Sequence, residues 1–135
     1  MQMGTADLVA ADYITGVQHL GIPVRDMDGT LKFYGDLGFE EAFSTRNNGK
    51  RVVFVKQKNL VIELYEEDET AAKPGAIDHV ALDVTDVERT FELVGALGYE
   101  MLDTEIQFLP FWEHGVKFFT IMGPNGEKVE FSQKM

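Results

Sequence analysis

The chain has 135 residues, no cysteine, and 12 basic against 23 acidic side chains, for a formal net charge of −11. This length suits one domain with its own core, and the lack of cysteine excludes disulfides, thiolate metal sites and cysteine nucleophiles and is consistent with a cytoplasmic protein. A strongly acidic surface repels phosphate and anionic lipid, and no apolar stretch approaches the roughly 20 residues of a membrane span, so neither nucleic acid nor membrane is an expected partner.

Residues 1–15 are expected to form an N-terminal leader or a short helix ahead of a single domain at 16–135. Within that domain an alternating strand is followed by apolar residues at helical spacing and then by three strand-like runs. The five elements are expected at about 16–24, 28–36, 39–46, 50–57 and 59–66. After a linker at 67–75 the same order returns over 76–133, which predicts a βαβββ module written twice.

The two copies can be aligned directly. Residues 18–40 and 78–100 share eight identities at a constant offset of 60, including His19 over His79. In the last strand of each copy Glu63 matches Glu130, and the second copy carries seven additional residues, which we expect near 106–115.

The phase of each strand predicts which way its side chains point, because residues two apart share a face. Leu20, Ile22 and Val24 form an apolar face that should pack on the helix, which leaves His19 on the opposite face. The same reasoning places Glu63, His79 and Glu130 on the helix-free faces. If the two modules close around these faces, the four side chains would converge.

Two imidazoles and two carboxylates form a ligand set for zinc, nickel, cobalt, iron or manganese. Any one strand histidine or glutamate is more often a solvated or hydrogen-bonded residue. The coincidence of four such residues at matched positions and in one phase favours a metal site. Four protein ligands on an octahedral ion would leave two positions for water or substrate oxygens.

Four motifs, HLGIPVRDMDGTLKFYGDLGFE, LVIELYE, IDHVALDVTDVERTFELVGALGYE and GPNGEKVEFSQ, resemble those of the vicinal oxygen chelate superfamily, which has the glyoxalase/bleomycin resistance/dioxygenase fold. The resemblance implies an α+β fold of two tandem βαβββ modules, with curled mixed sheets around a cleft and helices on the outer face. It also implies His19, Glu63, His79 and Glu130 as ligands of one divalent metal ion. This set is most similar to that of bacterial glyoxalase I (lactoylglutathione lyase), which implies nickel or cobalt, with zinc also favoured.

The same resemblance implies a lyase or isomerase that moves a proton on a vicinal-oxygen substrate such as a hemithioacetal. Glu130 or Glu63 would act as the general base, with Glu130 the first choice. Superfamily members usually form dimers, and the metal site could lie within one chain or be shared by two. Two alternatives stay open: an epimerase or thiol transferase on the same scaffold, and a metal-free small-molecule binding protein of the bleomycin-resistance type.

Two groups of residues are candidates for substrate contact. Arg46 and Arg51 could bind the anionic tail of a glutathione or other thiol adduct, although such a cluster is also typical of a solvated strand end. Phe111 and Trp112, in the additional segment of the second copy, could wall a substrate pocket or instead contribute to the core or a subunit contact.

Overall fold

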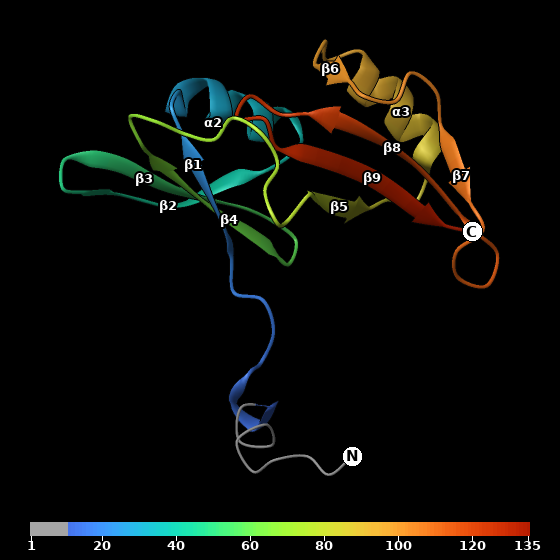
Figure 1. Cartoon of the computed structure of the whole chain (residues 1–135), viewed down its shortest axis with the longest axis horizontal. Helices are drawn as coiled ribbons and strands as arrows, with labels where there is room; N and C mark the ends of the chain where they lie inside the picture. Colours follow the sequence, from blue (N-terminus) through green and yellow to red (C-terminus); the bar gives the residue numbers. More distant parts are fainter. Residues whose placement is uncertain (1–10) are drawn as a thin grey trace.

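The first module of the protein is a four-stranded sheet covered on one face by a helix, as seen in a computed structural model that describes residues 11–135 (Figure 1). The strand order is β1-β4-β3-β2, and β1 runs parallel to β4. The elements are β1 (Leu20–Val24), α2 (Met27–Asp36), β2 (Glu40–Asn47), β3 (Lys50–Gln57) and β4 (Leu60–Glu66).

The second module repeats this plan with one change. Its sheet has the order β5-β9-β8-β6, and a short strand β7 also pairs with β8, so the counterpart of β2 is divided in two. The elements are β5 (His79–Asp83), α3 (Val87–Gly95), β6 (Glu100–Met101), β7 (Gln107–Leu109), β8 (Val116–Met122) and β9 (Lys128–Lys134). The expected α+β architecture of two mixed sheets is confirmed.

Shared residues of the repeat begin each helix in the same way. The carboxylates of Asp26 and Asp86 each accept a hydrogen bond of 3.0 Å from the backbone N–H three residues later. Thr30 and Thr90 each donate from their hydroxyl to the backbone carbonyl of that aspartate, at 2.7 Å. The carboxylate contacts satisfy backbone donors that a helix start otherwise leaves unpaired, and the aspartate and threonine shared by the two copies make the same contacts in both.

The predicted strand phase is confirmed by burial. Val24, Ile62, Leu64, Val129 and Phe131 are all buried on the helix-facing sides of their sheets. They belong to one hydrophobic cluster that contains residues of both modules. The two modules therefore share a core and do not form separate domains.

Polar contacts between the modules supplement this shared core. Buried Tyr34 on α2 donates its hydroxyl to Glu127 Oε2 at 2.9 Å, across the module boundary. Asn125 donates from Nδ2 to the Thr30 hydroxyl at 3.1 Å and also bonds Glu127. Burial, together with the nearby Glu127 carboxylate, raises the pKa of Tyr34, so its hydroxyl stays protonated and remains a donor.

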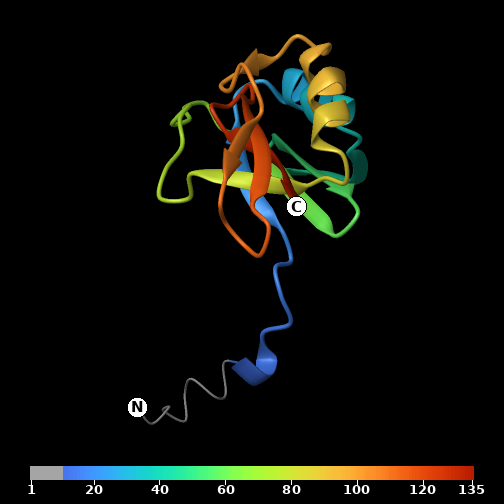
Figure 2. The same cartoon turned by 90° about the vertical axis from the view of Figure 1, so that its right-hand side faces the viewer.

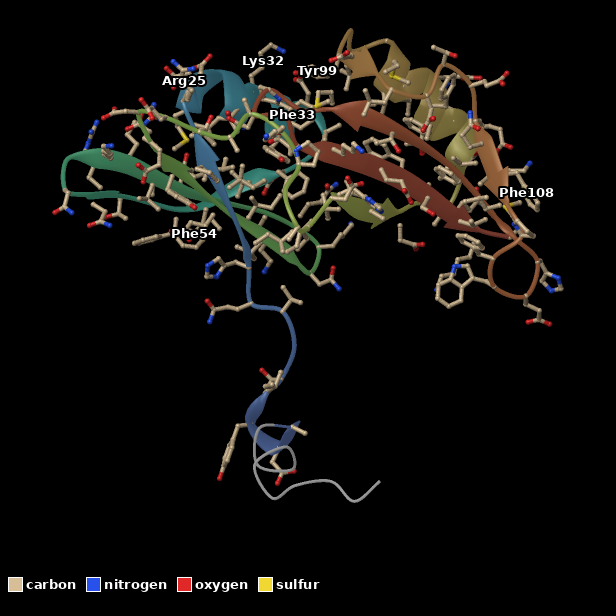
Figure 3. All side chains as sticks on the ribbon, viewed as in Figure 1. Arg25, Lys32, Phe33, Phe54, Tyr99 and Phe108 are labelled. Atoms are coloured by element: carbon tan, nitrogen blue, oxygen red, sulfur yellow. The ribbon has the colours of Figure 1, made fainter. Side chains whose placement is uncertain are left out.

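An aromatic contact lies beside these bonds. The rings of Phe33 on α2 and Tyr99 in the second module meet edge to face, with centroids 4.8 Å apart, and both are labelled at the module boundary in Figure 3. Turn residue Gly126 packs against the linker so closely that an added Cβ would lie 2.2 Å from the carbonyl oxygen of Ala72. The 123–126 turn is thus held between α2 and the linker.

An N-terminal arm precedes β1 and extends away from both sheets (Figures 1 and 2). Residues 11–13 are helical, and Tyr13, Ile14 and Val17 are exposed. The rest of the expected leader, residues 1–10, lies outside the described part of the chain. Among the described helices, none has the length and apolar character needed to cross a membrane.

Replacing Tyr34 by Phe should lower the free energy of unfolding by about 1–3 kcal/mol, because Glu127 loses a donor in a part-buried setting. Tyr99→Phe is the matched control. It removes a hydroxyl that bonds Asp36 at an exposed position, so its cost should stay below about 1 kcal/mol. Urea unfolding of the two variants checks the difference, and a Tyr34→Phe protein as stable as the wild type would contradict the assigned contact.

Candidate metal centre

The first half-site lies where β1 and β4 run side by side. His19 directly precedes β1, which begins at Leu20, and its Nε2 lies 3.3 Å from Oε1 of Glu63 on β4. The other ring nitrogen, Nδ1, lies 2.9 Å from the side-chain oxygen of Gln18. Gly21, the residue paired with Glu63, adds no side chain beside the carboxylate.

The second half-site repeats this geometry between β5 and β9. Nε2 of His79 lies 3.5 Å from Oε1 of Glu130, and its Nδ1 lies 3.0 Å from Oδ2 of Asp78. Lys128 Nζ lies 3.2 Å from Oδ1 of the same aspartate. The hydrogen bond from His79, with Lys128 adding to it, lowers the pKa of Asp78. Asp78 is therefore an anion that holds the imidazole.

The side-chain oxygens on Nδ1 define the chemistry of the two histidines. When the proton of the neutral ring is on Nδ1, that nitrogen donates to the oxygen of Gln18 or Asp78, and Nε2 carries the lone pair that a metal ion requires. Metal-ligating histidines are commonly oriented by such a contact at the other nitrogen. Gln18 and Asp78 were not singled out from the sequence, although each immediately precedes a repeated histidine.

The spacing within each half-site fits a divalent cation. Two electron-rich atoms, an imidazole Nε2 and a carboxylate oxygen, face each other at 3.3 Å and 3.5 Å. Two ligands that each lie about 2.1 Å from one ion are separated by roughly 3.0–3.4 Å in octahedral or tetrahedral geometry. The 3.3 Å pair lies within this range and the 3.5 Å pair just above it. The four side chains are 19–43% exposed and so remain accessible to an ion. Each half-site can supply two ligands.

The two half-sites do not meet within one chain. Across residues 11–135, no group of three or more His, Asp or Glu side chains is close enough to hold a metal ion. The convergence expected from the strand phase is therefore not achieved by a single copy. The reason is that the modules join through α2 and the 123–127 segment, on the helix side, and do not close around the ligand faces.

A large open groove separates the modules. Its volume is about 1320 Å³, and it runs from the arm and the β3–β4 turn to β5 and α3. Leu93 and Leu97 are conspicuously exposed there. The lining is mainly apolar and comes from both modules, with Leu20, Leu37, Leu60, Val80, Leu82 and Val94 among its members.

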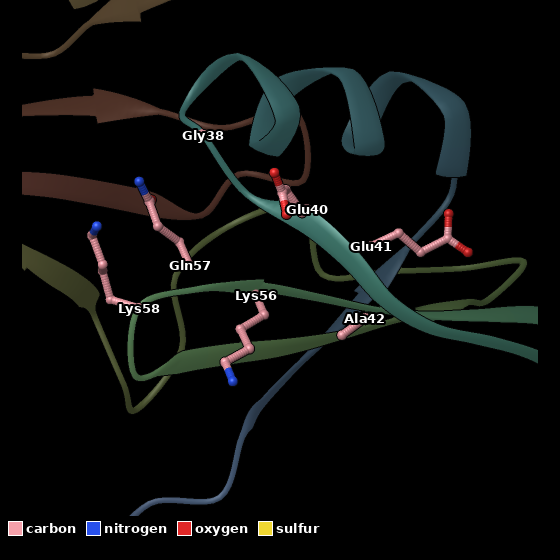
Figure 4. A pocket seen from close by; sticks show the side chains of 7 residues that line it. All are labelled: Gly38, Glu40, Glu41, Ala42, Lys56, Gln57 and Lys58. Carbon is pink, nitrogen blue, oxygen red and sulfur yellow. The ribbon is translucent and has the colours of Figure 1, made fainter.

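A smaller hollow lies at the C-terminal end of α2, against β2 and β3 (Figure 4). Its lining mixes acidic and basic side chains and contains none of the four candidate ligands. The lining residues are Gly38, Glu40, Glu41, Ala42, Lys56, Gln57 and Lys58. It has no convergent set of groups that would support chemistry.

Arg46 and Arg51 lie away from the candidate ligands. They pair across β2 and β3, and Arg51 bonds Asp28 on the first turn of α2 at 2.8 Å, which places it on the helix side of the sheet. Arg46 donates to the carbonyl of Gly49 at 2.7 Å. Both guanidinium groups are thus engaged locally, and their positions give no support to substrate contact on the ligand face.

Phe111 and Trp112 lie in the loop between β7 and β8, and both are exposed. The ammonium group of Lys134 lies 3.8 Å from the centroid of the Trp112 ring. Lys134 and Glu130 share a face of β9 but are four residues apart, a separation of about 13 Å along the strand. The structure therefore places Trp112 at the far end of the strand that carries Glu130.

The sequence profile of the Glyoxalase/Bleomycin resistance protein/Dioxygenase superfamily matches residues 16–131. The chain belongs to this superfamily. Among curated proteins, this superfamily member is 28% identical to the uncharacterized protein YwbC of Bacillus subtilis over 126 residues, which are 87% of this chain and 97% of that protein.

Solved structures share the fold of this superfamily member at low sequence identity. A glyoxalase family protein from Enterococcus faecalis aligns with a TM-score of 0.76 at 20% identity, over 89% of this chain and 98% of that one. The fosfomycin resistance protein FosX from Listeria monocytogenes, in complex with Mn(II) and sulfate, aligns with a TM-score of 0.72 at 19% identity, over 90% and 94% of the two chains. These likenesses confirm the predicted fold.

Replacing His79 by Ala in this superfamily member should remove metal binding and leave the metal-free fold intact. The side chain is 43% exposed, and its polar contacts with Asp78 and Glu130 lie at the surface, so the free energy of unfolding should change by no more than about 0.5 kcal/mol. His114→Ala is the control, since that residue contacts only Glu113. Metal content after reconstitution and thermal unfolding with and without metal check both statements; a fully metal-loaded His79→Ala protein would contradict the site.

Proposed function

We propose that this protein is a divalent-metal-dependent isomerase or lyase of the glyoxalase type, which transfers a proton on a substrate with vicinal oxygens such as a hemithioacetal. One observation carries the proposal: two matched His–Glu pairs lie on the helix-free faces, each with Nδ1 held by a side-chain oxygen and Nε2 directed at the carboxylate. A structural role alone would not require the same three-part arrangement in both modules.

The proposed metal centre is shared between two copies of the chain. His19 and Glu63 of one protomer would join His79 and Glu130 of the partner subunit, and a two-fold axis would generate a second, identical centre. The separation of the half-sites within a chain supports this arrangement, because two ligands are too few for a stable catalytic site. The open apolar groove adds support, since a second copy could cover its exposed leucines.

The two glutamates carry the proton chemistry in this proposal. A bound divalent metal ion would act as a Lewis acid toward the vicinal oxygens of the substrate and make the adjacent C–H more acidic. Glu130 is the preferred base, because its side chain is less exposed than that of Glu63, at 19% against 28%, and is therefore better shielded from bulk water. It would accept the proton from one carbon and return it to the next.

The identity of the metal is part of the proposal. The nitrogen and oxygen donor set suits nickel, cobalt, zinc, iron and manganese alike. Resemblance to bacterial glyoxalase I favours nickel or cobalt, and the presence of Mn(II) in the FosX structure adds manganese as a candidate. A thiol adduct as substrate rests on the resemblance alone, because Arg46 and Arg51 are engaged elsewhere.

The decisive experiment removes metal with a chelator and adds back nickel, cobalt, zinc, manganese or iron(II). The expected result is one metal ion per chain and metal-dependent isomerisation of the methylglyoxal–glutathione hemithioacetal, with kcat reduced 100-fold or more in Glu130→Gln. Glu127→Gln is the matched control, because that glutamate lies three positions before Glu130 and bonds Tyr34.

Three other results would contradict the proposal in different ways. Failure to bind any metal would point to a small-molecule binding protein. The protein could bind metal and fail to turn over the hemithioacetal. Turnover of an acyl-CoA epimer would then indicate an epimerase, and turnover of fosfomycin with a thiol would indicate a thiol transferase. Full activity in Glu130→Gln would mean that a group other than Glu130 acts as the base.

A further inference from the structure

Two phenylalanines form a row with the first half-site. Phe43 on β2 pairs with Phe54 on β3, and Phe54 in turn pairs with Glu63 on β4. Paired residues of adjacent strands share a face, so both rings lie on the face that carries Glu63, and Figure 3 shows Phe54 on the side of the sheet away from α2. We call these two residues the aromatic ridge.

The aromatic ridge is in direct contact with a candidate ligand. The rings of Phe54 and His19 meet edge to face with centroids 5.5 Å apart, and the rings of Phe43 and Phe54 are 6.2 Å apart. Adjacent strands are about 4.8 Å apart, so the ridge begins one strand from Glu63 and ends two strands away. A ring attached directly to the chelating group of a substrate would extend from the metal ligands over this distance.

Core packing does not account for these rings. Phe43 is 59% exposed on a strand whose residues are all exposed, and the neighbours Val53 and Val55 of Phe54 are the residues that face the core. The corresponding position in the second module, opposite Glu130, is Thr120. The repeat therefore does not require an aromatic residue there, and the residue opposite the candidate glutamate is aromatic in the first module and polar in the second.

We propose that the aromatic ridge is a specificity-determining surface, which binds a flat apolar group, such as an aryl ring, attached to the chelating oxygens of the substrate. The inference rests on the proposed function, because the ridge acts next to metal-bound oxygens. It names a substrate class that the metal ligands alone do not define: vicinal-oxygen compounds with an aryl or similar planar substituent are preferred over small aliphatic ones. Ring contacts of this kind typically change affinity by roughly 2- to 10-fold each.

The test compares two probes that chelate a metal through the same two oxygens and differ in one substituent. Acetohydroxamate carries a methyl group and benzohydroxamate a phenyl ring. Titration calorimetry of the metal-loaded wild-type protein should give about tenfold tighter binding of benzohydroxamate. In Phe43→Ala this preference should fall to about threefold or less, with the affinity for acetohydroxamate unchanged. Phe43 is chosen because it does not touch His19.

Phe108→Ala is the matched control. Phe108 is 57% exposed, close to the value for Phe43, but lies on β7 in the other sheet and pairs with Lys117. It should keep the tenfold preference. Sedimentation of each variant establishes that the oligomeric state is that of the wild type.

The outcomes separate this inference from the proposed function. If both wild type and Phe43→Ala bind acetohydroxamate and prefer benzohydroxamate by the same factor, the proposed role of the aromatic ridge is wrong, and the proposed metal centre is still supported. A change of oligomeric state in Phe43→Ala also overturns it, because the ridge would then be a subunit contact. If the protein takes up no metal and binds neither probe, the proposed function fails and the inference falls with it.

Discussion

The interface between the two modules determines how many metal ligands one chain brings together. It consists of a shared apolar core, the bond from buried Tyr34 to Glu127, and the packing of the 123–127 segment under α2 and the linker. All these contacts lie on the helix side of the sheets. The helix-free faces are consequently left open, and each keeps a His–Glu pair that forms no larger group of candidate metal ligands within residues 11–135.

Duplication explains why the half-sites are so similar. Each module places an imidazole before or at the start of its edge strand and a glutamate on the parallel strand next to it. In each, the preceding residue supplies an oxygen for Nδ1. The similarity is limited to this centre, because the residue opposite the glutamate is Phe54 in the first module and Thr120 in the second. Two equivalent half-sites with different neighbouring residues can bind one metal ion together and still bind a substrate in a single orientation.

Much of the fold could be predicted from the sequence because its period and its repeat agree. The alternation of Leu20, Ile22 and Val24 correctly predicted the core face, and the shared Asp and Thr mark helix starts in both copies. The sequence signal for Phe54 is an apolar residue one position out of phase with Val53 and Val55, which face the core. Strand phase gives the face of a residue but not the distance between two sheets, so the separation of the half-sites could not be predicted.

Other features depended on details that periodicity does not contain. An irregular register between Glu41 and Phe43 resets the alternation of β2, so the face occupied by Arg46 could not be read from the sequence. The partner of Arg51 is Asp28, a residue 23 positions away on the helix, and only the packing of α2 brings the two together. The division of the β2 counterpart into β6 and β7 reflects the additional residues of the second copy.

The claim that one metal centre is built by two chains can be tested by complementation. One chain would carry His19→Ala with Glu63→Ala, the other His79→Ala with Glu130→Ala, and a different affinity tag on each would allow the mixed dimer to be purified. Neither variant alone should bind metal. The mixed dimer retains one intact pair of half-sites on opposite chains, so we expect one metal ion per dimer, half the wild-type content. A mixed dimer without metal would contradict the shared centre.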